Sequence, residues 1–590
     1  MSRKPYKLVH LRIRIVVFNQ VVCTLCGNMA EQLTRSYIKV DLPVWTLKHQ
    51  TFPEAMKHYA ETKPDGESVV FVSTDGTREC VTWFQLYQRS QIMAKSLIKM
   101  GIQRHEVVTI NVRCCPEWLY ATFGAMMAGA IPVSISFTYT DGSDLIALMK
   151  KMETCSLLIL DPGADSINWN ILRKLLDEYK ADGRAKSHQM PYLKYVLGVR
   201  FDGHSDATFV KDISDLLAED HLEVELPVIK PDDLYGLFQT SGSTGVPKLV
   251  SNAHKSALKM AGALDISEVL NPRYILFNDR PFNWGGGYPF SILTGQTRVT
   301  FSEFCDPPND RLSYMINVIV KEKCSMVIAL PPLINELIKR QEHLPDDWPV
   351  EGILTVGQPL TKHLAACIGK ACKFLLCVYG GSELGCATVA KITDPDDFVE
   401  FGCGKPLNIP EMEIKIVDEN AEVVPVNRRG EIYIRSEAMF TGYFNDPEKT
   451  KAVLSEDGWY KTDDIGRMTE DGEFFVEGRK SNMIISGGFN IAPEILENVM
   501  KTFPGVDSVI IVPVPDDVYY QVLCACIVKK GDCEISEEDI RKNCHEYHAD
   551  KPGLFTVLPK YYMFLESFPE TRSGKTHRNE LERIALQRFR

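Results

Sequence analysis

The stretch VVTINVRCCPEWLYATFGAMMAGAIPVSIS, from Val107 to Ser136, decides the fold class of this 590-residue chain. It starts with VVTINV, an apolar run typical of a buried strand, and ends with a second such run, IPVSIS. Between them lies PEWLYATFGAMMAGA, which predicts a helix that Pro116 opens. A strand, a helix and another buried strand in this order predict parallel strands covered by helices on both faces.

The same alternation continues on both sides of this stretch. Upstream, TFPEAMKHYAET predicts a helix, SVVFVS a strand, and WFQLYQRSQIMAKSLIKMG a helix that ends at Gly101. Downstream, SLLILD adds another buried strand. We therefore expect an α/β fold with a large N-terminal domain of mixed and parallel sheets layered with helices.

The pattern changes after about residue 410. EMEIKIVD, GEIYIRS and GEFFVEG are short strands with Gly-containing turns, which predict a small antiparallel sheet within the large domain. Beyond Gly478, a helix, two strands, a helix and a strand predict a small, separate α+β C-terminal domain. The expected divisions are an N-terminal extension over 1–44, a large domain over 45–477, a hinge over 478–481 and a C-terminal domain over 482–590.

Composition and charge narrow the classes of function. The net charge of −12 argues against nucleic acid as a partner, and no apolar run is long enough to predict an integral membrane segment. The 17 cysteines lie mostly in apolar stretches and include one CxxC pair, Cys23 and Cys26, which is typical of reduced thiols in an intracellular protein. Residues 1–30 are basic and free of acids, so a mitochondrial presequence and a cytoplasmic location both stay open.

The nonamer TSGSTGVPK, from Thr240 to Lys248, combines small, hydroxyl-bearing and turn-forming residues with one cation. A loop without bulky side chains lets backbone N–H groups approach a ligand closely, and glycine permits φ > 0 at little cost. Because the hydroxyls add donors and Lys248 adds a positive charge, the stretch suits phosphate. Taken alone, the same composition is also typical of a surface turn.

Three later stretches support a phosphate site. VYGGSELG contains Glu383, and a carboxylate beside a phosphate loop needs a cation between them, which makes Glu383 a candidate Mg²⁺ ligand. Asp464 and, fifteen residues later, Arg479 could bind the hydroxyls of a ribose. PETRSGKTHRNEL places Lys575 in a Ser-Gly turn. Singly, these residues also suit a solvated turn, surface charges and a basic tail.

In this order, these motifs resemble those of the adenylate-forming superfamily, which includes acyl-CoA synthetases, nonribosomal adenylation domains and luciferases. The resemblance covers about residues 45–585, and the stretch MIISGGFNIAPEILE is most similar to medium-chain acyl-CoA ligases. It implies an AMP-binding adenylation domain over 45–477 and a C-terminal domain that rotates about the hinge. It also implies ATP, Mg²⁺ and coenzyme A as cofactors and a small-molecule carboxylic acid as substrate.

The resemblance also implies a role for each residue at a matching position. The β- and γ-phosphates would be held by Thr240, Ser241, Gly242, Ser243, Thr244, Gly245 and Lys248. The adenosine and α-phosphate would lie against Tyr379, Gly380, Gly381, Ser382, Asp464 and Arg479, with Glu383 on Mg²⁺. Lys575 would bridge the substrate carboxylate and the α-phosphate, and Gly487 and Gly488 would line the pantetheine path. The catalytic set would be Lys248, Ser382, Glu383 and Lys575.

The sequence departs from the family pattern at four places. Relatives usually carry Asp or Lys where Ser481 stands, and Asn482 beside it is also neutral, which leaves the balance between the two hinge states open. The usual Thr-Gly-Asp has Asp463 at its centre, and Leu249 replaces a Gly. NDRPFNWGGGYPF places Trp284 where relatives have an aromatic or His gate, so Trp284 is either a wall of the acid pocket or a core residue.

The leading hypothesis is an acid–coenzyme A ligase that forms an acyl-adenylate and pyrophosphate. NDRPFNWGGGYPF lacks the acidic anchor of amino-acid-activating domains, and fifteen residues after Lys575 leave no room for a carrier domain. The acetate-type signature Trp-Gln-Thr-Glu is absent, so a medium-chain fatty acid is expected, with an aryl acid as the second choice. Delivery of the acyl group to a carrier or to oxygen, and a non-catalytic nucleotide-binding relative, are the alternatives. The oligomeric state stays open.

Overall fold

The computed structural model describes most of the chain after residue 32. The described ranges are 33–41, 48–137, 141–163, 166–202, 210–218, 220–240, 247–266, 271–305, 309–357, 362–486, 489–491, 493–516, 520–531, 533–549, 558–571 and 575–589. Four features singled out from the sequence lie outside them: the basic segment 1–30, the pair Cys23 and Cys26, the loop residues 241–245, and Gly487 with Gly488.

The stretch that predicted parallel strands lies in a seven-stranded sheet. Across this sheet, as far as the described residues go, the strand order is β21 (Gly442–Tyr443), β11 (Lys248–Ala253), β10 (Leu234–Thr240), β5 (Ile131–Ser134), β4 (Val107–Asn111), β6 (Cys155–Leu160) and β9 (Tyr195–Gly198). From β10 to β9 all neighbours are parallel, whereas β11 and β21 pair antiparallel at one edge. The predicted strands VVTINV, IPVSIS and SLLILD are therefore confirmed.

A second, larger sheet has fourteen strands within the described residues. Its order is β1 (Tyr37–Lys39), β19 (Glu413–Val417), β20 (Gly430–Arg435), β22 (Tyr460–Met468), β23 (Phe474–Arg479), β18 (Gly402–Pro406), β17 (Gly385–Ile392), β16 (Phe374–Gly381), β15 (Gly352–Val356), β14 (Met326–Ile328), β12 (Leu276–Phe277), β13 (Arg298–Phe301), β2 (Glu67–Val72) and β3 (Arg78–Thr82). The run from β16 to β2 is parallel, and the rest is antiparallel.

The antiparallel strands predicted after residue 410 form, but they are not a separate sheet. Strand β18 pairs with β17 on one side and with β23 on the other, so the antiparallel part continues the parallel part. Backbone packs closely at this junction: a Cβ on Gly404 would lie 2.1 Å from the carbonyl oxygen of Val389. The junction depends on backbone approach between distant segments, which strand periodicity does not reveal.

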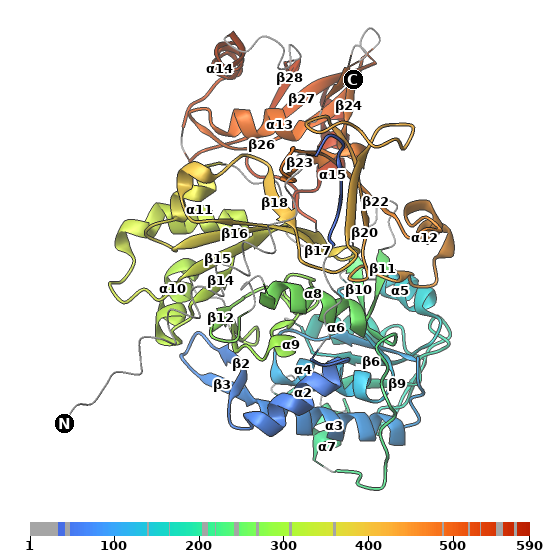
Figure 1. Ribbon diagram of the computed structural model, residues 1–590. Coiled ribbons are helices and arrows are strands. Elements are labelled where there is room, and N and C mark those ends of the chain that lie inside the picture. The colour runs from blue at the N-terminus through green and yellow to red at the C-terminus, as the bar shows by residue number, and fades with distance from the viewer. Residues whose placement is uncertain are drawn as a thin grey trace, which may run out of the picture.

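Helices begin where capping residues stand, as the sequence indicates. Helix α2 (Phe52–Thr62) begins after Thr51, whose Oγ1 accepts from the N–H of Glu54 (3.3 Å). Helix α3 (Trp83–Lys99) begins with a capping box in which Thr82 and Gln85 accept from each other's backbone N–H. Helix α4 (Pro116–Met127) begins at the predicted proline. These helices pack together beneath the seven-stranded sheet in Figure 1.

The C-terminal part folds around its own hydrophobic clusters. Its five-stranded sheet has the order β25 (Phe489–Ile491), β24 (Ile484–Ser486), β27 (Tyr520–Lys529) and β26 (Val506–Asp516), with β28 (Tyr561–Leu565) parallel to β27. Helices α13 (Pro493–Lys501) and α15 (Arg578–Phe589) pack on β26, and α14 (Glu537–Ala549) completes the unit. In Figure 1 this unit lies at the top, in orange to red, over the ends of β16 to β18.

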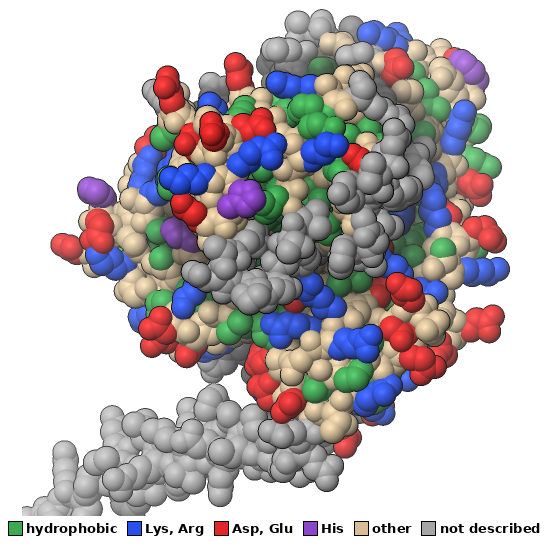
Figure 2. Space-filling view, turned by 90° about the horizontal axis from the view of Figure 1, so that it is seen from above, with side chains coloured by type: hydrophobic (Ala, Val, Ile, Leu, Met, Phe, Trp, Pro, Cys, Tyr) green, Lys and Arg blue, Asp and Glu red, His purple; other side chains and the backbone are tan. Residues whose placement is uncertain are grey.

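Two further features of the fold concern the charge of its surface and the character of its helices. Seen from above, positive and negative side chains are interspersed over the face shown in Figure 2. Within the described ranges, no helix combines the length and the apolar character that crossing a membrane requires.

Candidate active site

A cleft of about 2570 Å³ is lined by residues of the two large sheets and of the C-terminal unit. Every predicted site residue that the structure describes lines it: Thr240, Lys248, Tyr379, Gly380, Gly381, Ser382, Glu383, Asp464, Arg479 and Lys575. Small-molecule sites usually enclose about 300–1,000 Å³. The cleft can therefore hold more than one substrate at a time.

The strands beside the predicted phosphate loop place a lysine and a carboxylate around one tyrosine hydroxyl. Thr240 ends β10 and pairs with Lys248 at the start of β11. Lys248 Nζ lies 3.4 Å from the hydroxyl of Tyr443 and 4.7 Å from the centre of its ring. The same hydroxyl donates to Glu383 Oε1 (3.1 Å). Burial and the Glu383 carboxylate raise the pKa of Tyr443, so the phenol stays protonated and can donate.

The turn that carries Ser382 and Glu383 is fixed by two contacts from other elements. Asn252 of β11 donates its Nδ2 to the carbonyl oxygen of Ser382 (3.3 Å), and the N–H of Phe440 donates to that of Glu383 (2.8 Å). The described residues contain no group of three His, Cys, Asp or Glu side chains that could hold a metal. A single carboxylate fits Mg²⁺ that arrives with a nucleotide, because Mg²⁺ is usually bound by one or two carboxylates plus phosphate oxygens.

The candidate ribose ligands are opposite neighbours in one hairpin. Asp464 of β22 and Arg479 of β23 are register partners, and Arg479 Nε lies 2.9 Å from Asp464 Oδ1. The other oxygen, Oδ2, accepts from the hydroxyl of Tyr379 (2.6 Å). Burial raises the pKa of Asp464, although Arg479 and the Tyr379 hydroxyl oppose that shift. The fifteen-residue spacing in the sequence thus corresponds to one cross-strand pair.

Asp463, which replaces the usual glycine, adopts the left-handed backbone conformation with φ = 63°. This conformation is costly for residues with a Cβ, and least costly for Asp and Asn among them. We expect Asp463→Gly to raise the free energy of unfolding by up to about 1 kcal/mol, measured by urea denaturation. Asp463→Ala is the control, because it removes the carboxylate but keeps the Cβ. Equal stabilisation by both substitutions would contradict the backbone explanation and favour relief of charge repulsion.

Lys575 reaches the cleft from the C-terminal unit. A short hairpin holds its backbone: the N–H of Thr571 donates to the carbonyl oxygen of Lys575 (2.6 Å), and the N–H of Lys575 donates to Thr571 Oγ1 (3.2 Å). Desolvation by the surrounding protein, and then the charge of Arg479, lower the pKa of Lys575. The residue is exposed and lines the cleft, where a ligand could contact its side chain.

Trp284 lies in the wall of the cleft, at the end beyond Ser382. Its indole covers Gly286, where a Cβ would lie only 2.3 Å from the indole Cζ3, and its far edge faces Gly357. A Cβ on Gly285 would be 3.7 Å from Ser382 Oγ. The wall is therefore directly beside the predicted position of the α-phosphate, and of the two interpretations of Trp284 the structure favours the pocket wall.

Sequence patterns missed two residues that shape this site. Arg298 is completely buried and donates to the carbonyl oxygens of Asn278, Arg280 and Gly287, so it holds the loop that carries Trp284. Burial lowers its pKa to about 10. Tyr443 was missed because its partners Lys248 and Glu383 are 195 and 60 positions away. The only local signal is GYFNDPEKT, a turn sequence that carries no evident chemistry.

Comparisons with known proteins agree with this geometry. Residues 56–444 match the AMP-binding enzyme family, and residues 496–575 match the AMP-binding enzyme C-terminal domain. A mitochondrial medium-chain acyl-CoA ligase from Danio rerio is 27% identical over 93% of this chain and 90% of its own length. A 4-coumarate–CoA ligase from Oryza sativa is 26% identical over 86% of this chain and 87% of its own length.

A solved structure shows the same fold. The o-succinylbenzoate coenzyme A synthetase of Bacillus subtilis, in complex with ATP and magnesium ion, has a TM-score of 0.72 and 21% identity, and the alignment covers 90% of this chain and 99% of that one. The predicted fold class, a large mixed α/β domain followed by a small C-terminal domain, is confirmed. The family match extends over more than half of the sequence and includes Thr240, Lys248 and Tyr379–Glu383 of the cleft. The chain therefore belongs to the AMP-binding enzyme family, and its assignment from sequence motifs to the adenylate-forming acyl-CoA synthetases is confirmed.

Proposed function

We propose that this enzyme is an acid–coenzyme A ligase that activates a medium-chain fatty acid. ATP and the acid would give an acyl-adenylate and pyrophosphate, and the acyl group would then pass to the thiol of coenzyme A. One observation carries the proposal: Lys248, Glu383, Asp464 and Lys575 line the same cleft as the Trp284 wall. The names of the Danio rerio ligase and of the ATP- and magnesium-bound synthetase support the substrate class and the cofactors.

The charges in the cleft suit attack of a carboxylate on the α-phosphorus of ATP. Two unit charges 4 Å apart interact by about 4 kcal/mol at an effective dielectric near 20, so an anion approaching an anion meets a serious barrier. Lys575 would offset this repulsion, and Lys248 would stabilise the departing pyrophosphate. Mg²⁺, bound with the nucleotide at Glu383, would add positive charge at the phosphates. Asp464 and Arg479 would fix the ribose and so aim the α-phosphorus.

Part of the cleft wall is apolar, and we propose that this part binds the acyl chain. It includes Trp284, Leu330, Val356, Gly357 and Cys386. An apolar surface favours an alkyl or aryl chain over a charged one, because burial of a charge against apolar side chains is costly. We propose the alkyl chain, in agreement with the similarity to the medium-chain ligase. The similarity to the 4-coumarate ligase makes an aryl acid the alternative outcome of the test.

The test is an acid panel with and without coenzyme A. Purified enzyme, ATP and Mg²⁺ are incubated with straight-chain acids from acetate to laurate and with benzoate and cinnamate derivatives, and AMP and thioester are quantified. Coenzyme A-dependent AMP release that peaks at a medium chain supports the proposal. A peak at an aryl acid overturns the substrate class alone. Two outcomes would overturn the proposed ligase activity itself. One is AMP release without thioester formation, and the other is an enzyme that binds the nucleotide but does not turn over.

Trp284→Ala should shift the preference of the enzyme toward longer acids. Removing the indole opens the space between Gly286 and Gly357, so chains that clash with the indole gain entry while short chains lose contacts. We expect kcat/KM for acids two to four carbons longer than the best wild-type acid to rise about 10-fold relative to that acid. Trp284→Phe should give an intermediate shift. An unchanged chain-length profile in both variants would show that Trp284 does not bound the acyl pocket.

The division of the chain near residues 478–481 also remains a proposal. Lys480 Nζ pairs with Glu431 of β20 (2.7 Å), and Asn482 Nδ2 donates to Glu494 Oε1 at the start of α13 (2.9 Å). Ser481 thus lies between one residue held by the large domain and one held by the C-terminal unit. This arrangement supports the hinge and indicates that Asn482, although neutral, is anchored.

A further inference from the structure

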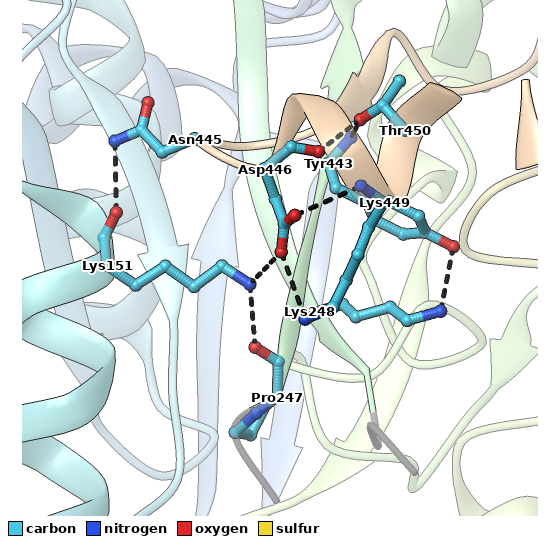
Figure 3. Close-up of polar contacts among 8 residues, drawn as sticks. All are labelled: Lys151, Pro247, Lys248, Tyr443, Asn445, Asp446, Lys449 and Thr450. Carbon is cyan, nitrogen blue, oxygen red and sulfur yellow. Dashed lines mark hydrogen bonds and ion pairs between the residues drawn. The ribbon is translucent and has the colours of Figure 1, made fainter. Parts of the chain in front are cut away.

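A half-buried ion pair lies next to the strand that carries Lys248. Lys151, in the last turn of α5 (Ser143–Met152), places Nζ 3.1 Å from Asp446 Oδ2 and 3.4 Å from the carbonyl oxygen of Pro247 (Figure 3). The Lys151 and Asp446 side chains are 13% and 18% exposed. The pair therefore ties the residue directly before Lys248 to two other elements. Neither Lys151 nor Asp446 belongs to the residue set described above.

The same aspartate is also connected to Tyr443. Asp446 caps α12 (Pro447–Val453), and its carbonyl oxygen accepts from Thr450 Oγ1 (2.9 Å). That hydroxyl oxygen in turn accepts from the N–H of Tyr443 (2.9 Å). Figure 3 shows these contacts around Asp446, with Lys248 directed at Tyr443 from the other side. One small network thus fixes both partners of the Lys248–Tyr443 contact.

The negative charge of Asp446 is neutralised by two lysines, Lys151 and Lys449. Burial by itself would raise the pKa of Asp446, but the hydrogen bonds from Lys151 and Lys449 outweigh it and lower the pKa. Lys449 Nζ lies 3.2 Å from Asp446 Oδ2 and is more exposed than Lys151. If Lys151 lost its charge, Lys449 would still neutralise Asp446, whereas the Pro247 carbonyl oxygen would lose its donor. Lys449 therefore cannot replace the hydrogen bond from Lys151 to the Pro247 carbonyl oxygen, which holds the strand that carries Lys248.

We propose that Lys151, held by Asp446, is a positioning residue that fixes the start of β11 so that Lys248 faces the β- and γ-phosphates of bound ATP. This inference rests on the proposed function, in which Lys248 binds those phosphates. It gives Lys151 no direct contact with the nucleotide. A misplaced Lys248 weakens binding of ATP and pyrophosphate, but it leaves binding of AMP unchanged, because AMP has neither the β- nor the γ-phosphate.

The test compares two nucleotides in one variant. We expect Lys151→Met, which keeps the length of the side chain, to weaken Mg²⁺–ATP binding about 10-fold by isothermal titration calorimetry and to leave AMP binding unchanged. The KM for ATP should rise by the same factor, with little change in kcat. Lys151→Arg keeps the charge and a donor and should recover most of the ATP affinity. Asp446→Asn should act in the same direction as Lys151→Met, and the two effects should not add.

Lys95→Met is the matched control. Lys95 of α3 pairs with Asp220 (2.6 Å), and its side chain is 15% exposed, close to the value for Lys151, but neither residue lines the cleft. We expect this control to leave both nucleotide affinities unchanged. Equal losses of ATP and AMP affinity in Lys151→Met, or an ATP affinity equal to that of the control, would overturn the positioning role alone. A wild-type enzyme that binds ATP no more tightly than AMP would overturn the proposed role of Lys248 as well.

Discussion

Lys575→Ala is expected to lower the rate of acyl-adenylate formation about 100-fold or more, because it removes the cation that meets the attacking carboxylate and the α-phosphate. Preorganised charges in a confined cleft usually stabilise a transition state by several kcal/mol, and Lys575 enters the cleft from a different unit than Lys248 and Glu383. The measurement is the burst of pyrophosphate release when the enzyme is mixed with saturating ATP and acid in the absence of coenzyme A.

The second half-reaction is the internal control for this variant. Thioester formation from synthetic acyl-adenylate and coenzyme A should be nearly unchanged in Lys575→Ala, because no carboxylate attack remains. Lys560→Ala is the matched surface control, since Lys560 also belongs to the C-terminal unit but pairs with Asp516. A normal adenylation burst in Lys575→Ala would refute the role given to this lysine.

The pH dependence of adenylation should also show the role of Lys575. Desolvation and then Arg479 lower the pKa of Lys575, so the ammonium loses its proton at a lower pH than an ordinary lysine. The adenylation rate should therefore fall on the alkaline side below the usual lysine range. Lys575→Arg, which stays charged throughout, should lack this alkaline limb.

Asp464→Ala is expected to lower kcat/KM for ATP about 100-fold, since it removes the acceptor for two ribose hydroxyls, and hydrogen bonds to a charged group contribute about 1.5–3 kcal/mol. It should also destabilise the fold by about 1–3 kcal/mol, because the buried Tyr379 hydroxyl loses its acceptor. Little of that loss comes from the ion pair, since the Arg479 side chain is 59% exposed. The measurements are steady-state kinetics and urea denaturation.

Adding Tyr379→Phe separates the structural effect of Asp464→Ala from its effect on ATP. The double variant has no unsatisfied hydroxyl, so it should regain most of the lost stability. It still lacks the ribose acceptor, so it should not regain ATP affinity. Recovery of both properties together would show that Asp464 acts on ATP only through the stability of the fold.

Asp464 should link stability and nucleotide binding to pH in opposite directions. Burial raises its pKa in the folded state, so its contribution to stability is fully present below the usual carboxyl pKa and is lost as the pH rises through the raised value. Ribose binding needs the ionised carboxylate and therefore improves over the same rise. The acid limb of kcat/KM for ATP should lie above the usual carboxyl range.

The sequence by itself determined the α/β alternation, the helix that begins at Pro116, and the ten candidate site residues that the described part of the structure brings to one cleft. It could do so because strand periodicity, capping and loop composition act within a few residues of each other. The ribose pair is nearly as local: Asp464 and Arg479 belong to one hairpin, and its register places them opposite each other.

Only the tertiary structure decided the contacts between distant segments. The hydroxyl of Tyr443 connects Lys248 and Glu383, Arg298 holds the loop that places Trp284, and β18 joins the antiparallel strands to the parallel sheet. Each of these depends on how separate elements pack, and packing selects one partner among many residues of the same chemical type. For the same reason the ion pair of Lys151 and Asp446, 295 positions apart, has no sequence signature.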